Sequence, residues 1–144
     1  MKTFLSYAVI LFFGVLTFSS CKKKLVTKVN TPVGFFENDW AGAMAKANEL
    51  DRKVFVQFYA DWCTHCESFK KNTLNDPTTE TYLKENFVVV LMDMEKGVGK
   101  EKYELHKFEG IPVLAVFDKT EALKGSKNGN LAPTDFKTWI DPLK

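Results

Sequence analysis

The chain has 144 residues and a formal net charge of +2, from 20 lysines and arginines against 18 aspartates and glutamates. This length is enough for one domain with a single hydrophobic core. A charge so close to neutral excludes the strongly basic class of chains that bind nucleic acid through charge alone. We therefore expect no nucleic-acid partner.

The first twenty residues predict an export signal that lies outside the fold. Lys2 gives a short positive start, residues 4–18 are almost wholly apolar, and two serines then precede Cys21. This is the layout of a secretory signal peptide. The apolar run is shorter than the roughly 20 residues that a membrane-spanning helix needs.

The end of this segment, Phe18-Ser19-Ser20-Cys21, resembles the lipobox of bacterial lipoproteins, although Phe18 replaces the usual Leu. The resemblance implies cleavage before Cys21, a lipid on its thiol, and attachment to a membrane of the bacterial cell envelope, with the domain facing the periplasm. The alternatives are an uncleaved anchor and an ordinary secretory signal cut nearby. The predicted organisation is a lipoprotein-type signal peptide at 1–20, a lipid-anchored linker at 21–34 and a folded domain at 35–144.

Within the domain, the first expected element is an amphipathic helix. Its apolar residues recur at the spacing of one helical face: Trp40, Ala43, Met44, Ala47 and Leu50. Asn38 or Asp39 would cap this helix. The apolar run at 54–60 predicts a buried strand, and a helix over about 63–74 follows it.

The chain then repeats this alternation of strands and helices. Asp76 can cap a second helix with Pro77 in its first turn. A buried strand is expected at 87–92, then a loop at the glycines around 97–99, and a short helix at 100–108.

The last third predicts two strands and a closing helix. A strand at 113–117 follows a proline, which a strand tolerates at its first residue. A weaker strand is expected at 122–127, and a helix at 133–143. The order of elements predicts an α/β domain with a mixed central sheet flanked by helices on both faces.

The most informative residues are Trp62-Cys63-Thr64-His65-Cys66, directly after the apolar run at 54–60. Of the three cysteines, the lipobox accounts for Cys21, so only the pair with C-x-x-C spacing remains. A disulfide that closes so small a loop constrains little of the unfolded chain. In an exported protein, the pair is therefore better explained as a redox couple than as a structural staple.

The stretch at 55–66, followed later by Gly110-Ile111-Pro112, resembles the thioredoxin superfamily over about residues 36–143. The sequence Tyr59-Ala60-Asp61-Trp62-Cys63 is especially similar to that of the periplasmic C-terminal domain of the disulfide reductase DsbD. The resemblance implies a thioredoxin fold and a thiol–disulfide oxidoreductase that acts on protein disulfides outside the cytoplasm. It implies no diffusible cofactor, and partners that carry disulfides or thiols, including one that recycles the dithiol.

The physical chemistry of the motif predicts distinct roles for its two cysteines. Cys63 would lie at the start of a helix, where free N–H groups and the helix dipole favour its thiolate, the nucleophile. Cys66 lies one turn further and would resolve the mixed disulfide. The alternative is a non-catalytic binding module for a metal or a partner protein. One C-x-x-C supplies two ligands, whereas structural zinc takes four, so we expect no metal site.

Four further residues would support the dithiol. A protonated His65 would stabilise the nearby thiolate, and in the family a His there is found in oxidases and isomerases; the alternative is an exposed ring without a partner. Pro112 matches the position that the family holds in cis, which would turn the Ile111 backbone edge toward a substrate chain. Trp62 would form part of the contact surface, or else pack in the core.

One residue departs from the family pattern. Most thioredoxins carry a buried Asp at the position of Gln57, where it accepts the proton as the resolving cysteine becomes a thiolate. Gln57 cannot ionise, so either this step is slower, or Asp61, Glu67 or water takes the proton. The net direction of electron flow does not follow from the sequence.

Overall fold

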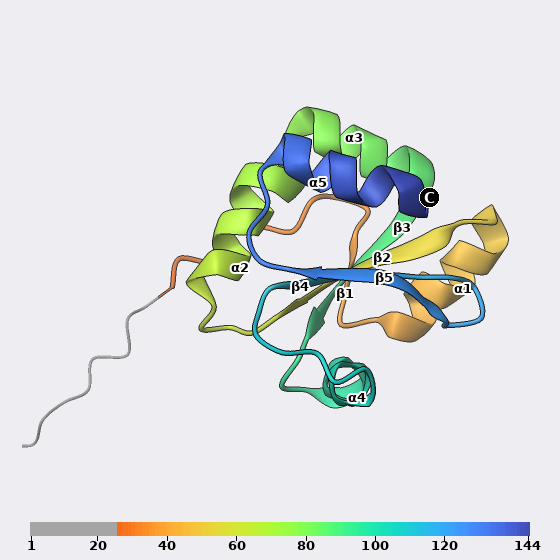
Figure 1. Ribbon diagram of the computed structural model, residues 1–144, viewed down its shortest axis with the longest axis horizontal. Helices are drawn as coiled ribbons and strands as arrows, with labels where there is room; N and C mark the ends of the chain where they lie inside the picture. The colour runs from red at the N-terminus through yellow and green to blue at the C-terminus, as the bar shows by residue number, and fades with distance from the viewer. Residues whose placement is uncertain (1–25) are drawn as a thin grey trace, which may run out of the picture.

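A computed structural model describes residues 26–144 (Figure 1). Its centre is a five-stranded sheet in the order β1-β3-β2-β4-β5. Strands β1, β3 and β2 run parallel to one another, and β4 and β5 continue the sheet with antiparallel pairing. The strands are β1 Phe36–Glu37, β2 Lys53–Tyr59, β3 Phe87–Asp93, β4 Val113–Phe117 and β5 Leu123–Asn128.

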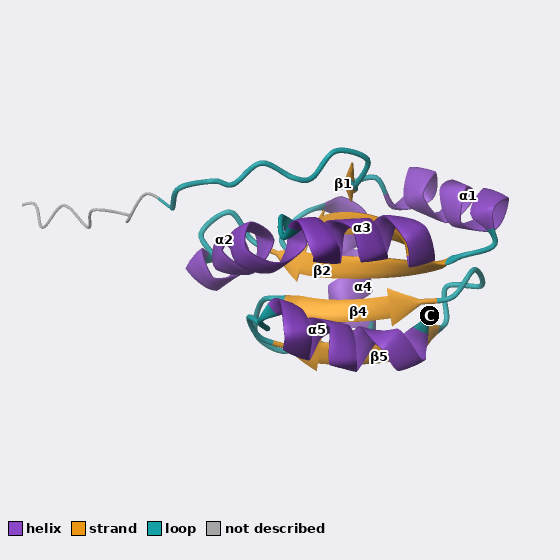
Figure 2. Ribbon diagram, turned by 90° about the horizontal axis from the view of Figure 1, so that it is seen from above, coloured by secondary structure: helices purple, strands orange, loops and turns teal. Residues whose placement is uncertain are grey.

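Helices cover both faces of this sheet, as the sequence predicted (Figures 1 and 2). One core cluster joins the sheet to α2, α3 and α5, and a second joins its other face to α1 and α4. The helices are α1 Trp40–Leu50, α2 Thr64–Phe69 with a π-helical extension at Lys70–Leu74, α3 Pro77–Asn86, α4 Gly97–Leu105, and α5 Pro133–Ile140 with a 3₁₀ turn at Asp141–Leu143.

The central strand β2 divides its side chains between the two faces because successive residues of a strand point to opposite sides. Phe55 and Tyr59 belong to the cluster under α2, α3 and α5, whereas Val56 and Phe58 belong to the cluster under α1 and α4. Both sides of β2 are buried, which explains why its sequence is apolar at nearly every position, with Gln57 as the buried polar exception.

The predicted helix caps are confirmed at two positions. The Asp39 carboxylate accepts a hydrogen bond from the Gly42 N–H at 2.8 Å and caps α1. The Asp76 carboxylate accepts one from the Thr79 N–H at 2.9 Å and caps α3, with Pro77 as its first residue. Each cap satisfies a backbone donor that has no partner inside its helix.

Two features of the fold differ from the sequence-based expectation. Leu50 was placed on the buried face of α1, but it is 39% exposed because the helix ends there. The glycines around 97–99 were expected in a loop, but they open α4. A Cβ atom at Gly99 would lie 2.2 Å from the Asp93 carbonyl oxygen, so glycine lets α4 begin tightly against the end of β3.

Candidate active site

The two cysteines of the motif lie where β2 turns into α2, at one end of the sheet (Figure 1). A disulfide joins Cys63 to Cys66, and these residues are only 5% and 1% exposed. Cys63 is the N-cap of α2, and its sulfur accepts a hydrogen bond from the Cys66 N–H at 3.0 Å. The same N–H would stabilise a thiolate on Cys63 once the disulfide is reduced.

The two aromatic side chains of the motif, Trp62 and His65, are exposed to solvent. Trp62 is 54% exposed, and its indole N–H donates to a Glu95 carboxylate oxygen at 3.1 Å. It is therefore a surface residue, and the alternative of simple core packing does not apply. His65 is exposed on the first turn of α2, between the two cysteines.

The Ile111–Pro112 pair lies directly before β4, whose first residue, Val113, pairs with Phe58 near the end of β2. Its peptide bond is cis. Pro112 is buried, whereas Ile111 is partly exposed and packs against the core cluster that contains both cysteines. The fold thus brings together two motifs that are separated by more than forty residues in the sequence.

Beneath the dithiol lies Gln57, at the position where the family usually carries a buried acid. Its side chain is fully buried, and its amide nitrogen donates to the Cys66 carbonyl oxygen at 3.2 Å. Its amide oxygen receives no hydrogen bond from any residue in the described range 26–144.

The two acids considered as substitutes for a buried Asp are both engaged elsewhere. Asp61 is exposed, and hydrogen bonds from Lys28 and Lys96, at 2.6 and 3.3 Å, lower the pKa of its carboxyl. Glu67 is buried beside Lys70, with 3.3 Å between its carboxylate oxygen and the lysine nitrogen.

Comparison with known proteins agrees with this geometry. Residues 36–119 match the protein family that is described as thioredoxin-like. The chain belongs to this thioredoxin-like family. It is 30% identical over 96 residues to the thiol:disulfide interchange protein DsbD of Actinobacillus pleuropneumoniae, a match that covers 64% of this chain and 16% of DsbD. It is 28% identical over 90 residues to protein disulfide-isomerase 1 of Dictyostelium discoideum, covering 62% of this chain and 24% of that protein.

Solved structures support the thioredoxin fold. A thioredoxin from Thermus thermophilus superposes with a TM-score of 0.67 at 22% identity, covering 76% of this chain and 87% of that one. The oxidised C-terminal domain of Neisseria meningitidis DsbD superposes with a TM-score of 0.63 at 19% identity, covering 76% and 99%. The matched region is only about a sixth of the length of the DsbD relatives.

In this thioredoxin-like domain, the segment that precedes β1 contacts the helix of the dithiol, which the sequence did not indicate. The Lys28 ammonium pairs with Asp61, two residues before Cys63. The Val29 N–H donates to the Glu67 carboxylate, directly after Cys66. Residues 26–34 form no helix or strand, so no periodic pattern in the sequence could have revealed these contacts. The predicted lipidation site, Cys21, lies outside the described residues.

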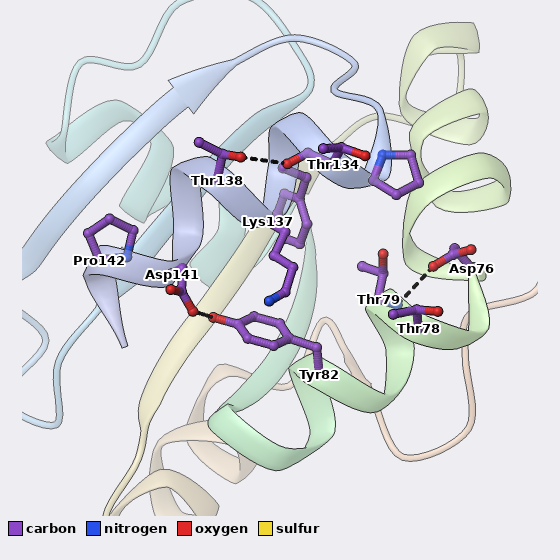
Figure 3. A pocket seen from close by; sticks show the side chains of 11 residues that line it. Asp76, Thr78, Thr79, Tyr82, Thr134, Lys137, Thr138, Asp141 and Pro142 are labelled. Atoms are coloured by element: carbon purple, nitrogen blue, oxygen red, sulfur yellow. Dashed lines mark hydrogen bonds between the residues drawn. The ribbon is translucent and has the colours of Figure 1, made fainter.

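A cavity of about 620 Å³ lies between α3 and α5, apart from the dithiol (Figure 3). The Tyr82 hydroxyl donates to an Asp141 carboxylate oxygen at 2.8 Å, and the Lys137 ammonium lies 4.7 Å from the Tyr82 ring centroid. Burial, together with the hydrogen bond to Asp141, raises the pKa of Tyr82. None of the sequence-predicted site residues lines this cavity.

Among the described residues, no three His, Cys, Asp or Glu side chains gather in a way that could hold a metal ion. Over the same residues, every helix is too short or too polar to cross a membrane.

Proposed function

We propose that this thioredoxin-like protein is a thiol–disulfide oxidoreductase that acts on protein disulfides outside the cytoplasm. The observation that carries the proposal is the Cys63–Cys66 disulfide at the first turn of α2, where a backbone N–H is directed at the Cys63 sulfur. This arrangement favours the thiolate at the cysteine nearer the helix start. The similarity to the proteins named DsbD and protein disulfide-isomerase supports the same chemistry.

The reaction is dithiol–disulfide exchange. In the reduced protein, the Cys63 thiolate attacks a substrate disulfide, whose S–S bond breaks, and one substrate thiol leaves with a proton. The Cys66 thiolate then attacks the Cys63 sulfur of the mixed disulfide and releases the second substrate thiol. The substrate has gained two electrons and two protons, and the protein returns to the disulfide form. A thiol-bearing partner must reduce that disulfide for another cycle, and the reverse sequence oxidises a dithiol substrate.

The surface around the dithiol supports a protein as substrate. The exposed Trp62 ring gives an amphipathic contact surface beside Cys63. The partly exposed Ile111 precedes β4, and its backbone edge would pair with an extended substrate chain in the manner of an added strand. Together they would hold a peptide segment across the nucleophile.

The proposed location is the periplasmic side of the bacterial cell envelope, with a lipid on Cys21 as the anchor. The basis is the signal-peptide layout of residues 1–20 and the lipobox-like residues that end at Cys21. Mass spectrometry of the mature N-terminus tests it: the expected species begins at a lipidated Cys21. An unmodified N-terminus at another residue would contradict the anchor while leaving the redox chemistry untouched.

The test of the activity is a pair of cysteine variants. We expect Cys63→Ser to abolish reduction of the insulin disulfides by a thiol source, because it removes the nucleophile. Cys66→Ser keeps the nucleophile but cannot resolve, so it should accumulate mixed disulfides that a reductant releases. Full exchange activity in Cys63→Ser would overturn the proposal, and an inactive wild-type protein would favour the binding-module alternative.

His65 is proposed to adjust the redox equilibrium of the pair. A protonated imidazole between the cysteines favours a negative charge on Cys63, and hence the reduced form. We expect His65→Pro to lower the reduction potential by about 30 mV, which is a tenfold change in the equilibrium constant with glutathione. Thr64→Ala, at the other residue between the cysteines, is the matched control. An equal potential in wild type and His65→Pro would show that the exposed ring has no such role.

A further inference from the structure

Gln57, beneath the dithiol, has a hydrogen bond at its amide nitrogen and none at its amide oxygen within the described residues 26–144. It lies in the middle of β2, paired with Leu91 of β3 and Leu114 of β4, neither of which has a side-chain donor. Its side chain is fully buried, and within residues 26–144 its amide oxygen has no hydrogen-bond partner. Such an atom costs free energy, because it has lost its water and gained nothing in return.

The other end of the same amide is hydrogen-bonded to the residue of the resolving cysteine. The amide nitrogen donates to the Cys66 carbonyl oxygen at 3.2 Å, which ties the side chain to the first turn of α2. Cys66 is 1% exposed and Gln57 is fully buried, so both side chains are shielded from bulk water. Cys66, whose carbonyl oxygen the amide nitrogen contacts, is also a residue whose side-chain hydrogen-bonding capacity changes with redox state.

In the disulfide form, Cys66 cannot be that donor, because neither sulfur carries a hydrogen. Reduction changes this. Two electrons and two protons from a dithiol, or from two glutathione thiols, break the Cys63–Cys66 bond, and the donor thiols leave as a disulfide. Cys66 then carries an S–H group, which is a hydrogen-bond donor.

We propose that Gln57 is a positioning residue for the resolving cysteine, and that its amide oxygen accepts the Cys66 S–H hydrogen bond in the reduced protein. The amide oxygen would then lack a partner in the disulfide form and have one in the dithiol form. A contact made in only one redox state shifts the equilibrium toward that state. Gln57 thus favours the reduced form and raises the reduction potential, without taking a proton itself.

The inference rests on the dithiol–disulfide cycle of the proposed function, but its test requires no turnover of a protein substrate. Gln57→Leu removes both the acceptor and its unmet hydrogen bond. We expect the equilibrium constant for reduction by glutathione, measured by thiol labelling, to fall about tenfold. A tenfold change corresponds to a potential about 30 mV lower. Gln57→Met, closer in length to glutamine, gives a second variant should Gln57→Leu fail to fold.

Urea unfolding of the oxidised and reduced forms distinguishes this role from a merely structural one. The substitution should destabilise the reduced form more than the oxidised form. Thr73→Val is the control, because the buried Thr73 hydroxyl donates to the Leu131 carbonyl oxygen at 2.6 Å, away from the cysteines. It should destabilise both forms equally and leave the potential unchanged.

The inference is overturned if the Gln57 variants destabilise both redox forms equally and keep the wild-type equilibrium with glutathione. If the Gln57 variants shift the equilibrium with glutathione as expected, but the wild-type protein does not reduce protein disulfides, then the proposed function is refuted and this inference stands.

Discussion

The two faces of the sheet differ in the kind of residue that they bury. The face under α2, α3 and α5 holds the dithiol, and its elements carry all six buried polar or charged side chains of the described residues. These are Gln57, Glu67, Lys70, Thr73, Thr79 and Asp93. The face under α1 and α4 buries aliphatic and aromatic side chains, and the polar tips of Trp40 and Tyr103 reach outward to partners.

This difference separates the site of chemistry from the source of stability. Burying a polar group is costly unless it is well paired, so a face with six of them gives up some stability. The apolar face has no such cost. Aromatic rings pack edge to face on both faces, so the buried polar groups are what distinguish the two. We infer that both faces stabilise the fold, and that the face under α2 also tunes the dithiol while the face under α1 and α4 does not.

The largest expected effect is on the apolar face, at Phe58. Its ring centroid lies 5.9 Å from that of Tyr103 and 5.4 Å from that of Phe108, and its side chain is fully buried. Phe58→Ala should lower the free energy of unfolding by about 3–5 kcal/mol, because it loses buried area and leaves a cavity. Urea denaturation measures this loss.

The same variant should keep the wild-type reduction potential, since Phe58 faces away from the cysteines. Phe58→Leu, with a smaller cavity, should do the same at a smaller loss of stability. A potential that moved with either variant would show that the two faces are not separate in their roles.

A somewhat smaller effect is expected on the dithiol face, at the buried pair of Glu67 and Lys70. Lys70→Met leaves the Glu67 carboxylate buried without its cation, which typically costs about 3–5 kcal/mol. The Val29 N–H still donates to that carboxylate, so we expect the lower end of this range.

The double variant Glu67→Gln, Lys70→Met is the control for this prediction. It removes both charges and keeps an acceptor for the Val29 N–H, so most of the lost stability should return. Urea denaturation of the two single variants and the double variant completes the cycle. Additive losses in the double variant would show that the ion pair itself contributes nothing.

The sequence alone predicts the structure correctly wherever a local pattern of residues determines it. The strands around Phe55 and Leu114 follow from their predominantly apolar runs, and the caps Asp39 and Asp76 from their position before a helix. The dithiol at the start of α2 followed from a motif that joins a strand to a helix. In each of these cases, the deciding residues are neighbours in the chain.

The sequence alone does not predict the structure where contacts between distant segments determine it. Strand β1 has only two residues, too few for a period, and exists because it pairs with Val90 and Leu91. The loop expected at Gly99 became helix because of its approach to Asp93. The orphan amide oxygen of Gln57 depends on its neighbours on two other strands and on α2, which no spacing in the sequence reveals.

The smallest expected effect is on the pH dependence of stability, and it arises at His106 on the apolar face. This ring stacks on Phe108 and meets the edge of Phe117, and burial, together with the nearby Lys102, lowers the pKa of His106. The unfolded chain, with a His pKa of about 6.5, therefore binds a proton more readily than the folded protein does. The stability that this neutral ring contributes is full above about pH 6.5 and is lost as the pH falls through the lowered folded-state pKa.

His106→Asn should therefore reduce the loss of stability between pH 8 and pH 5, measured by urea denaturation at each pH. Because the ring is partly open to solvent, screening keeps the difference between variant and wild type below about 1 kcal/mol. The measurement at pH 8, where the imidazole is neutral in both states, isolates the cost of lost packing. An identical pH dependence in the two proteins would show that the titrating group lies elsewhere, and the acid-sensitive part of the fold would then be sought among the paired carboxylates of the dithiol face.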